Sequence, residues 1–259
     1  MLFPIADEND DRRSTPWVNY SIILINILVF VFLQGLGSNE RFTYAFSTVP
    51  AEIISGHDIV TRDRILVEPV TGQRVEVPGL QPTPIPVFLT LITSMFMHGG
   101  LAHIFGNMLF LWIFGDNIED RVGHLRYLIF YLVCGVLAGL AHVFTTVIFA
   151  GNNEASLLVP SLGASGAISG VLGAYILLFP TRRVTVLISW FVTQVPAFIA
   201  IGLWFLFQLI SGLGMLGSGS QQGGVAYGAH IGGFISGLAL IKIFEIGRPR
   251  ADTYFSRGY

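Results

Sequence analysis

The chain of 259 residues has only 12% charged residues, 53% of its residues are hydrophobic, and its formal net charge is −2. Soluble domains typically contain about 25% charged residues, so this chain lacks the polar groups that cover a soluble globule. The composition also excludes a disordered chain, and the absence of clustered Lys and Arg excludes a nucleic-acid-binding surface.

Stretches that lack Asp, Glu, Lys and Arg predict the elements of the fold. They cover residues 14–38, 77–115, 127–153, 155–181 and 184–241. A transmembrane helix needs about 20 apolar residues, so the first four stretches hold one span each and the last holds two. We therefore expect an all-α polytopic membrane protein with six spans, at about 17–36, 98–115, 127–148, 161–179, 185–210 and 225–245.

The Lys and Arg residues predict the orientation of these spans. With the N-terminus inside, ten of the 14 basic residues lie on the inner side and four lie in one outer loop. Cytoplasmic loops carry the excess of basic residues, so we expect both termini to be cytoplasmic. This divides the chain into a short cytoplasmic segment (1–16), a six-helix domain (17–246) and a cytoplasmic tail (247–259).

The outer loop at residues 37–86 is expected to hold small elements of its own. Pro50 follows Val49, as at the start of a short helix. The pattern of residues 65–77 is typical of a small β-hairpin, with the turn at Thr71 and Gly72. Further along the chain, Pro196 falls inside the fifth span and predicts a kink there, from which we hypothesise that this span moves.

Polar side chains inside the spans are costly in a membrane, so they are candidates for function. His103 and Asn107 lie in the second span, Ser165 in the fourth and His230 in the sixth. These three spans run from outside to inside. His103, Ser165 and His230 each lie about four or five residues from the start of their spans, so they are expected at a similar depth. The sequence therefore predicts one polar site near the outer side of the bundle.

Glycines beside these residues indicate that the helices approach closely. Gly166 and Gly170 are four residues apart in the fourth span, and Gly232 and Gly233 follow His230. Close approach brings the Ser165 hydroxyl near the His230 imidazole, which is the arrangement of an activated nucleophile and its base. No carboxylate lies within the last four spans except at the cytoplasmic end, so the expected site is a dyad.

The chain resembles the rhomboid family of intramembrane serine proteases. The resemblance covers roughly residues 15–246, and it is carried by three motifs in the family's order: His98-Gly-Gly with His103 and Asn107, Gly163-Ala-Ser165-Gly166, and Ala229-His230 followed by Gly232-Gly233. One departure is Ser169, because some members carry a Tyr at this position that stacks on the base.

The resemblance implies a six-helix bundle whose active site opens to the outer face. It implies Ser165 as nucleophile and His230 as general base. It also implies an oxyanion hole made by Asn107, His103 and the Ser165 backbone N–H, with support from His98, Gly163 and Gly166. The implied substrates are single-span membrane proteins cleaved in or near their transmembrane segments. The enzyme would need no cofactor or metal, and we expect it in a bacterial-type plasma membrane.

Other classes of membrane protein remain as alternatives. The chain has no His-Glu-x-x-His zinc motif and no Asp within the interior of any predicted span, as zinc and two-aspartate intramembrane proteases require. A non-enzymatic transporter, or a rhomboid-like protein that binds without cleaving, stays open. A transporter needs polar residues along the whole depth of the bilayer, whereas here they gather near the outer side.

Overall fold

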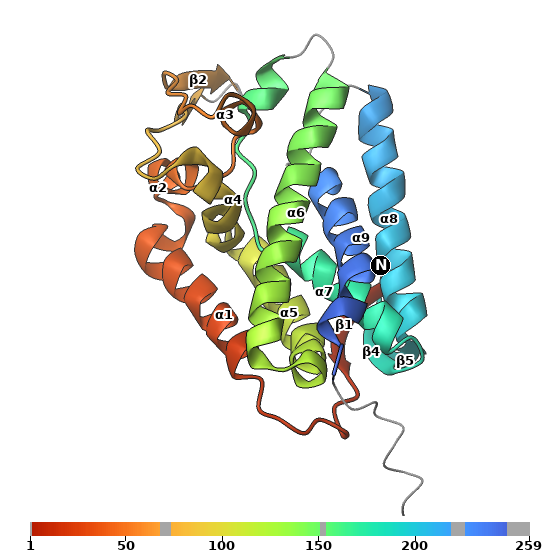
Figure 1. Ribbon diagram of the computed structural model, residues 1–259. Coiled ribbons are helices and arrows are strands. Elements are labelled where there is room, and N and C mark those ends of the chain that lie inside the picture. The colour runs from red at the N-terminus through yellow and green to blue at the C-terminus, as the bar shows by residue number, and fades with distance from the viewer. Residues whose placement is uncertain (1, 68–73, 151–153, 219–225, 248–259) are drawn as a thin grey trace, which may run out of the picture.

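The computed structural model describes residues 2–67, 74–150, 154–218 and 226–247, and shows a bundle of helices with two small sheets (Figure 1). The longer helices are α1 (Trp17–Leu28), α5 (Leu101–Val122), α6 (His124–Ala150), α7 (Ser165–Leu178), α8 (Ala197–Ser218) and α9 (Tyr227–Phe244). Shorter helical segments are η1 (Val29–Leu33), η2 (Gly35–Gly37), α2 (Glu40–Ala45), α3 (Pro50–Ser55), η3 (Val87–Leu89), α4 (Thr90–Thr93), η4 (Ser94–Phe96) and η5 (Glu154–Leu158).

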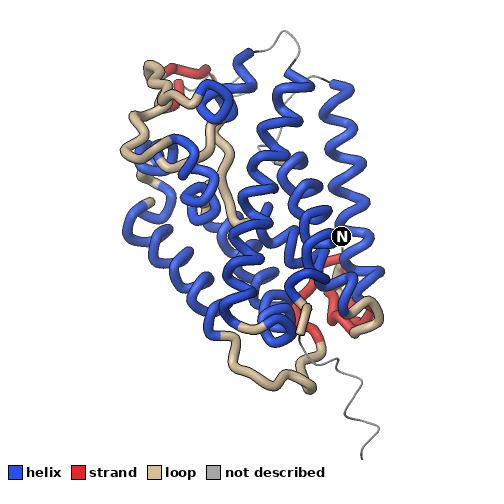
Figure 2. The backbone as a smooth tube through the Cα atoms, viewed as in Figure 1, coloured by secondary structure: helices blue, strands red, loops and turns tan. Residues whose placement is uncertain are grey.

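The strands lie at opposite ends of the bundle (Figure 2). One antiparallel pair consists of β2 (Arg64–Val67) and β3 (Arg74–Val77), and a three-stranded sheet has the order β1 (Leu2–Asp7), β4 (Arg183–Ile188), β5 (Phe191–Pro196). The mostly helical fold is confirmed, but the prediction of an all-α protein is wrong because these sheets are present.

The outer loop has the elements that its sequence predicts. α3 begins at Pro50, whose ring fixes a helical φ at a position where no backbone donor is needed. β2 and β3 pair from Arg64 with Val77 to Val67 with Arg74, which confirms the hairpin. The predicted turn at Thr71 and Gly72 lies outside the described residues.

The fifth predicted span, at about 185–210, is wrong in its first half. Residues 183–196 form β4 and β5, and α8 begins only at Ala197. Val184 and Val186 are fully buried, at alternate positions as a strand with one buried face requires. Pro196 ends β5 and does not interrupt a helix, so the expected kink, on which the hypothesis of a moving span rested, is absent.

The described helices fit a membrane protein. α5, the His124–Phe149 part of α6, and α9 are each long and apolar enough to cross a bilayer, and the segments Trp17–Leu33, Val87–Phe96, Ser165–Leu178 and Ala197–Gly212 are shorter apolar helices. The count of six spans and the side on which the termini lie stay predictions.

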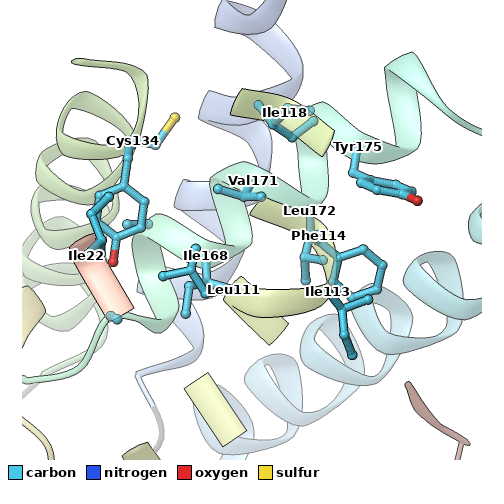
Figure 3. Packing of buried hydrophobic residues seen from close by; sticks show 14 of the residues in the cluster. Ile22, Leu111, Ile113, Phe114, Ile118, Cys134, Ile168, Val171, Leu172 and Tyr175 are labelled. Carbon is cyan, nitrogen blue, oxygen red and sulfur yellow. The ribbon is translucent and has the colours of Figure 1, made fainter. Parts of the chain in front are cut away.

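The core lies where α5, α6, α7 and α9 meet. Leu111 and Phe114 of α5 pack with Ile168, Leu172 and Tyr175 of α7, and these residues are at most 3% exposed (Figure 3). α7 and α9 approach so closely that a Cβ added at Gly233 would overlap the carbonyl oxygen of Gly166. The close approach that the glycines predict is therefore present, and it brings the first turn of α7 against α9.

Ion pairs lie at the end of the bundle where α5 ends and where the N-terminal segment leads into α1. Arg12 pairs with Asp116 at 2.8 Å, Arg121 with Glu245 at 2.6 Å, and Arg182 with Asp11 at 2.5 Å. Basic residues that the sequence places on one side of the membrane thus lie at one end of the molecule.

Candidate active site

Ser165 is the first residue of α7, and extended chain leads down to it from η5 (Figure 1). This extended segment is held by backbone hydrogen bonds. The Ser161 N–H donates to Thr48 O at 2.7 Å and the Thr48 N–H donates to Ser161 O at 3.0 Å. The Gly163 N–H donates to Ser94 O at 2.9 Å. Non-helical backbone at membrane depth is tolerated only where its polar groups are satisfied inside the protein. These bonds meet that need and fix the position of Ser165.

Ser165 and His230 form a direct hydrogen bond. Ser165 Oγ lies 2.8 Å from His230 Nε2, although the residues are 65 apart in the chain. His230 is in the first turns of α9, the helix that packs against α7 through Gly166 and Gly233. Because Ser165 opens its helix, its backbone N–H is among the four that have no acceptor within the helix. That N–H is therefore a candidate donor to a developing negative charge.

His103 and Asn107 lie over the turn before Ser165. Gly163 has φ of +118°, a conformation that residues with a Cβ rarely adopt, and a Cβ there would lie 2.8 Å from His103 Nε2 and 3.7 Å from Asn107 Nδ2. The glycine is therefore required both by its backbone angle and by the side chains above it. It lets two polar side chains of α5 reach the chain that carries Ser165.

Asn107 has a donor that nothing in the described part of the chain satisfies. The residue is 8% exposed, and its buried Nδ2 has no hydrogen-bond partner there. A buried amide donor without an acceptor costs free energy, which a bound carbonyl oxygen would recover. The geometry thus suits a donor kept for a ligand.

His98 is fully buried and held from α1's side of the bundle. The Gln34 Oε1 atom accepts the His98 N–H at 2.9 Å, and the Gln34 Nε2 group donates to His98 O, also at 2.9 Å. The His98 ring meets the His103 ring edge to face, with centroids 5.2 Å apart. His98 therefore buttresses His103 and does not touch Ser165 through any contact described.

Two aromatic rings flank His230. The Trp204 ring of α8 lies 6.0 Å from it, tilted by 37°, and the Tyr227 ring lies 6.4 Å away, edge to face. Ser169, at the position where some rhomboid proteases carry a stacking Tyr, donates to the backbone oxygen of Ser165 at 2.6 Å. Ring contacts to the histidine thus come from α8 and α9 in place of α7.

Sequence reasoning missed one contact of the site. Gln208 of α8 places its Oε1 atom 2.7 Å from His230 Nδ1. The signal for this contact is a single glutamine among apolar residues, since residues 197–210 contain no other polar side chain except the Trp204 indole. As for metals, no group of three or more His, Cys, Asp and Glu side chains within the described ranges is placed to hold an ion.

Comparison with known proteins places the chain in a family. Residues 87–245 match the Rhomboid domain family. The chain is 30% identical to Rhomboid protein 1, mitochondrial, of Saccharomyces cerevisiae over 150 residues, which cover 58% of this chain and 40% of the relative. It is also 30% identical to Rhomboid protease GluP of Bacillus subtilis over 168 residues, which cover 64% of this chain and 28% of the relative.

A third relative, like the first, has a name that does not mention proteolysis. The chain is 32% identical to the human Presenilin-associated rhomboid-like protein, mitochondrial, over 121 residues, which cover 43% of this chain and 30% of the relative. The matched part thus spans well under half the length of each of these relatives. Two of the three are named as mitochondrial proteins and one is bacterial.

Proposed function

Because the chain belongs to the rhomboid family, an integral membrane family that includes proteases, we propose that it is an intramembrane serine endopeptidase with Ser165 as nucleophile and His230 as general base. The observation that carries the proposal is the 2.8 Å hydrogen bond between Ser165 Oγ and His230 Nε2, at the start of a short helix inside the bundle. A serine is a weak nucleophile until an adjacent base accepts its proton.

The first half of the reaction forms an acyl-enzyme. Ser165 Oγ attacks the carbonyl carbon of the scissile peptide bond while His230 Nε2 takes the hydroxyl proton. The carbonyl oxygen becomes an oxyanion, for which the unpartnered Asn107 amide, the His103 ring and the Ser165 backbone N–H are the candidate donors. The bond to nitrogen then breaks, and His230 gives its proton to the leaving amine.

The second half releases the new carboxyl end. A water molecule gives a proton to His230 Nε2 and attacks the ester carbonyl, and the proton returns to Ser165 Oγ as the ester bond breaks. No step requires a metal or another cofactor. The same donors serve the second oxyanion.

The proposed substrates are single-span membrane proteins, cleaved in or near their transmembrane segments. A peptide bond within an intact helix is closed to attack, so a small residue before the cut and helix-weakening residues after it would favour cleavage. The proposed setting is a bacterial-type plasma membrane with both termini cytoplasmic, which puts the start of α7 toward the outer leaflet.

Cleavage by the purified full chain in liposomes tests this proposal. The substrate is a single-span protein with a small residue at the outer end of its span. We expect Ser165→Ala and His230→Ala to abolish cleavage, whereas Ser169→Ala, one turn along the same helix, leaves it intact. A metal chelator should leave the rate unchanged. Cleavage at the full rate by Ser165→Ala would refute the mechanism, and binding without cleavage by the wild type would favour a rhomboid-like binding protein.

A further inference from the structure

Three side chains from three helices form a hydrogen-bonded series through the imidazole of His230. Ser165 of α7 bonds to Nε2 at 2.8 Å, and Gln208 of α8 bonds to Nδ1 at 2.7 Å. Gln208 is only 6% exposed, so water has little access to its side chain and does not compete for the hydrogen bond to His230. Both ring nitrogens of His230 therefore have a protein partner.

The chemistry of the partners decides which nitrogen carries the proton. The amide oxygen of Gln208 is only an acceptor, so the atom facing it must be an N–H. In a neutral imidazole the other nitrogen then has a free lone pair, and this is the atom that faces the Ser165 hydroxyl. The arrangement selects the one tautomer in which His230 can take a proton from the serine.

We propose that Gln208 is a positioning residue that holds His230 in the tautomer and ring orientation needed for general base catalysis. The inference rests on the function proposed above. It gives the dyad a third member, which the sequence did not supply as a carboxylate within the last four predicted spans outside their cytoplasmic end. Gln208 acts through His230 and does not touch the reacting atoms.

An amide suits this position better than a carboxylate would. The site lies inside an apolar bundle, where an ionised side chain is costly. A neutral amide oxygen still fixes the ring, and it accepts a stronger hydrogen bond once the imidazole becomes charged during the reaction. The amide thus supplies orientation without adding a charge at rest.

The same helix also holds the ring from its face. Trp204 is four residues before Gln208, so both project from one side of α8, and the Trp204 ring lies 6.0 Å from that of His230. Two contacts from one helix therefore determine how the base is oriented. The activity of the dyad consequently depends on where α8 lies relative to α9.

Kinetics of Gln208 variants in liposomes test this role. Gln208→Met keeps the length of the side chain and removes the acceptor, so kcat should fall roughly 10- to 100-fold with KM unchanged, as for a lost hydrogen bond to a charged group. Gln208→Glu retains an oxygen acceptor and should keep kcat within a few-fold of the wild type. The matched control is Gln194→Met, a glutamine exposed on β5, which should not change either constant.

A tautomer measurement separates this inference from the proposed function. In protein labelled with ¹⁵N-histidine, NMR should show the proton of the neutral His230 ring on Nδ1 in the wild type. In Gln208→Met it should show a mixture of the Nδ1–H and Nε2–H tautomers, whether or not any substrate is cleaved. Gln208→Leu serves as a second apolar variant if the first does not fold. Unchanged kcat and an unchanged tautomer in a folded apolar variant would overturn the role of Gln208. A wild type that cleaves nothing, or a Ser165→Ala variant that cleaves, would overturn the protease proposal and leave the tautomer result standing.

Discussion

The interior of the helix bundle around Ser165 and the end of the bundle where α5 terminates hold their polar groups by different means. Around Ser165 the polar side chains are neutral, and the hydrogen bonds to His230 come from a hydroxyl and an amide. At the end where α5 terminates, carboxylates dominate: Asp116 pairs with Arg12, and Glu119 accepts the backbone N–H groups of two residues at the start of α1.

The difference follows from the cost of charge in a membrane. Near the end of a span, water and basic side chains stabilise a carboxylate, whereas deeper in the bundle they do not. The interior site therefore uses neutral hydrogen bonds and glycine contacts, and the charged end of the bundle uses ion pairs. Substitutions at the site should reduce activity, while substitutions at the charged end should reduce stability and leave activity of the folded protein intact.

Beyond the two residues of the dyad, the largest expected effect is on activity, from Asn107→Ala. Removal of an oxyanion donor typically lowers kcat by about 10²–10³-fold, and the Nδ2 of Asn107, which has no partner within the described ranges, is a proposed donor. Cleavage rates in liposomes measure the change, with thermal unfolding as the check on folding. A stable Asn107→Ala variant with wild-type kcat would remove Asn107 from the oxyanion hole.

The next largest effect is expected from Gly233→Ala. The added Cβ would overlap the backbone oxygen of Gly166, and overpacking of this kind costs about 1–3 kcal/mol. Gly202→Ala is the matched control, because a Cβ at that position in α8 has nothing within 4 Å. Thermal unfolding in detergent should show a loss of stability for Gly233→Ala and none for Gly202→Ala. Equal stability of the two would mean that α7 and α9 do not need this contact.

A smaller loss of stability is expected at the charged end. α1 has no side-chain cap from its own sequence, and instead Glu119 accepts the N–H groups of Val18 at 2.9 Å and Asn19 at 2.6 Å. Glu119→Ala should cost about 0.5–2 kcal/mol, the range for a lost helix cap. The exposed Glu154 of η5 provides the control, as Glu154→Ala. The comparison of the interior site with the charged end fails if Glu119→Ala abolishes cleavage without changing stability.

The last prediction concerns pH and Asp7. Burial raises the pKa of this carboxyl to about 7, against the lowering effect of the hydrogen bond from Tyr175. The folded protein thus binds a proton that the unfolded chain releases near pH 4, so this group's contribution to stability falls as pH rises from about 4 to 7. Asp7→Asn should be more stable than the wild type above pH 7, with the difference vanishing toward pH 4. Melting temperatures across this range measure it, with Asp10→Asn as the exposed control.

The apolar helices of the fold and the proximity of Ser165 to His230 could be predicted from the sequence. Charge-free stretches locate apolar helices, and the glycines beside the two residues indicate which helix faces meet. The charge count could not separate a buried strand from a span, because both are apolar. Residues 183–196 are rich in β-branched residues and end in Pro196, a signal for strands that the charge count does not carry.

The supporting contacts of the site were less predictable. Gln208 touches His230 only because α8 and α9 pack with a particular rotation about their axes, and no local pattern determines that rotation. The same holds for Gln34, whose amide binds the backbone of His98 across 64 residues of sequence. Such contacts depend on tertiary packing, which one sequence without related sequences does not specify.

The central claim is that His230 activates Ser165 for attack, and covalent labelling tests it most directly. A fluorophosphonate that reacts with activated serines should modify the wild type at Ser165, as located by mass spectrometry of the peptides. His230→Ala should lose the label although Ser165 is still present, and Ser169→Ala should keep it. Equal labelling of wild type and His230→Ala, or a label on any residue other than Ser165, would contradict the account.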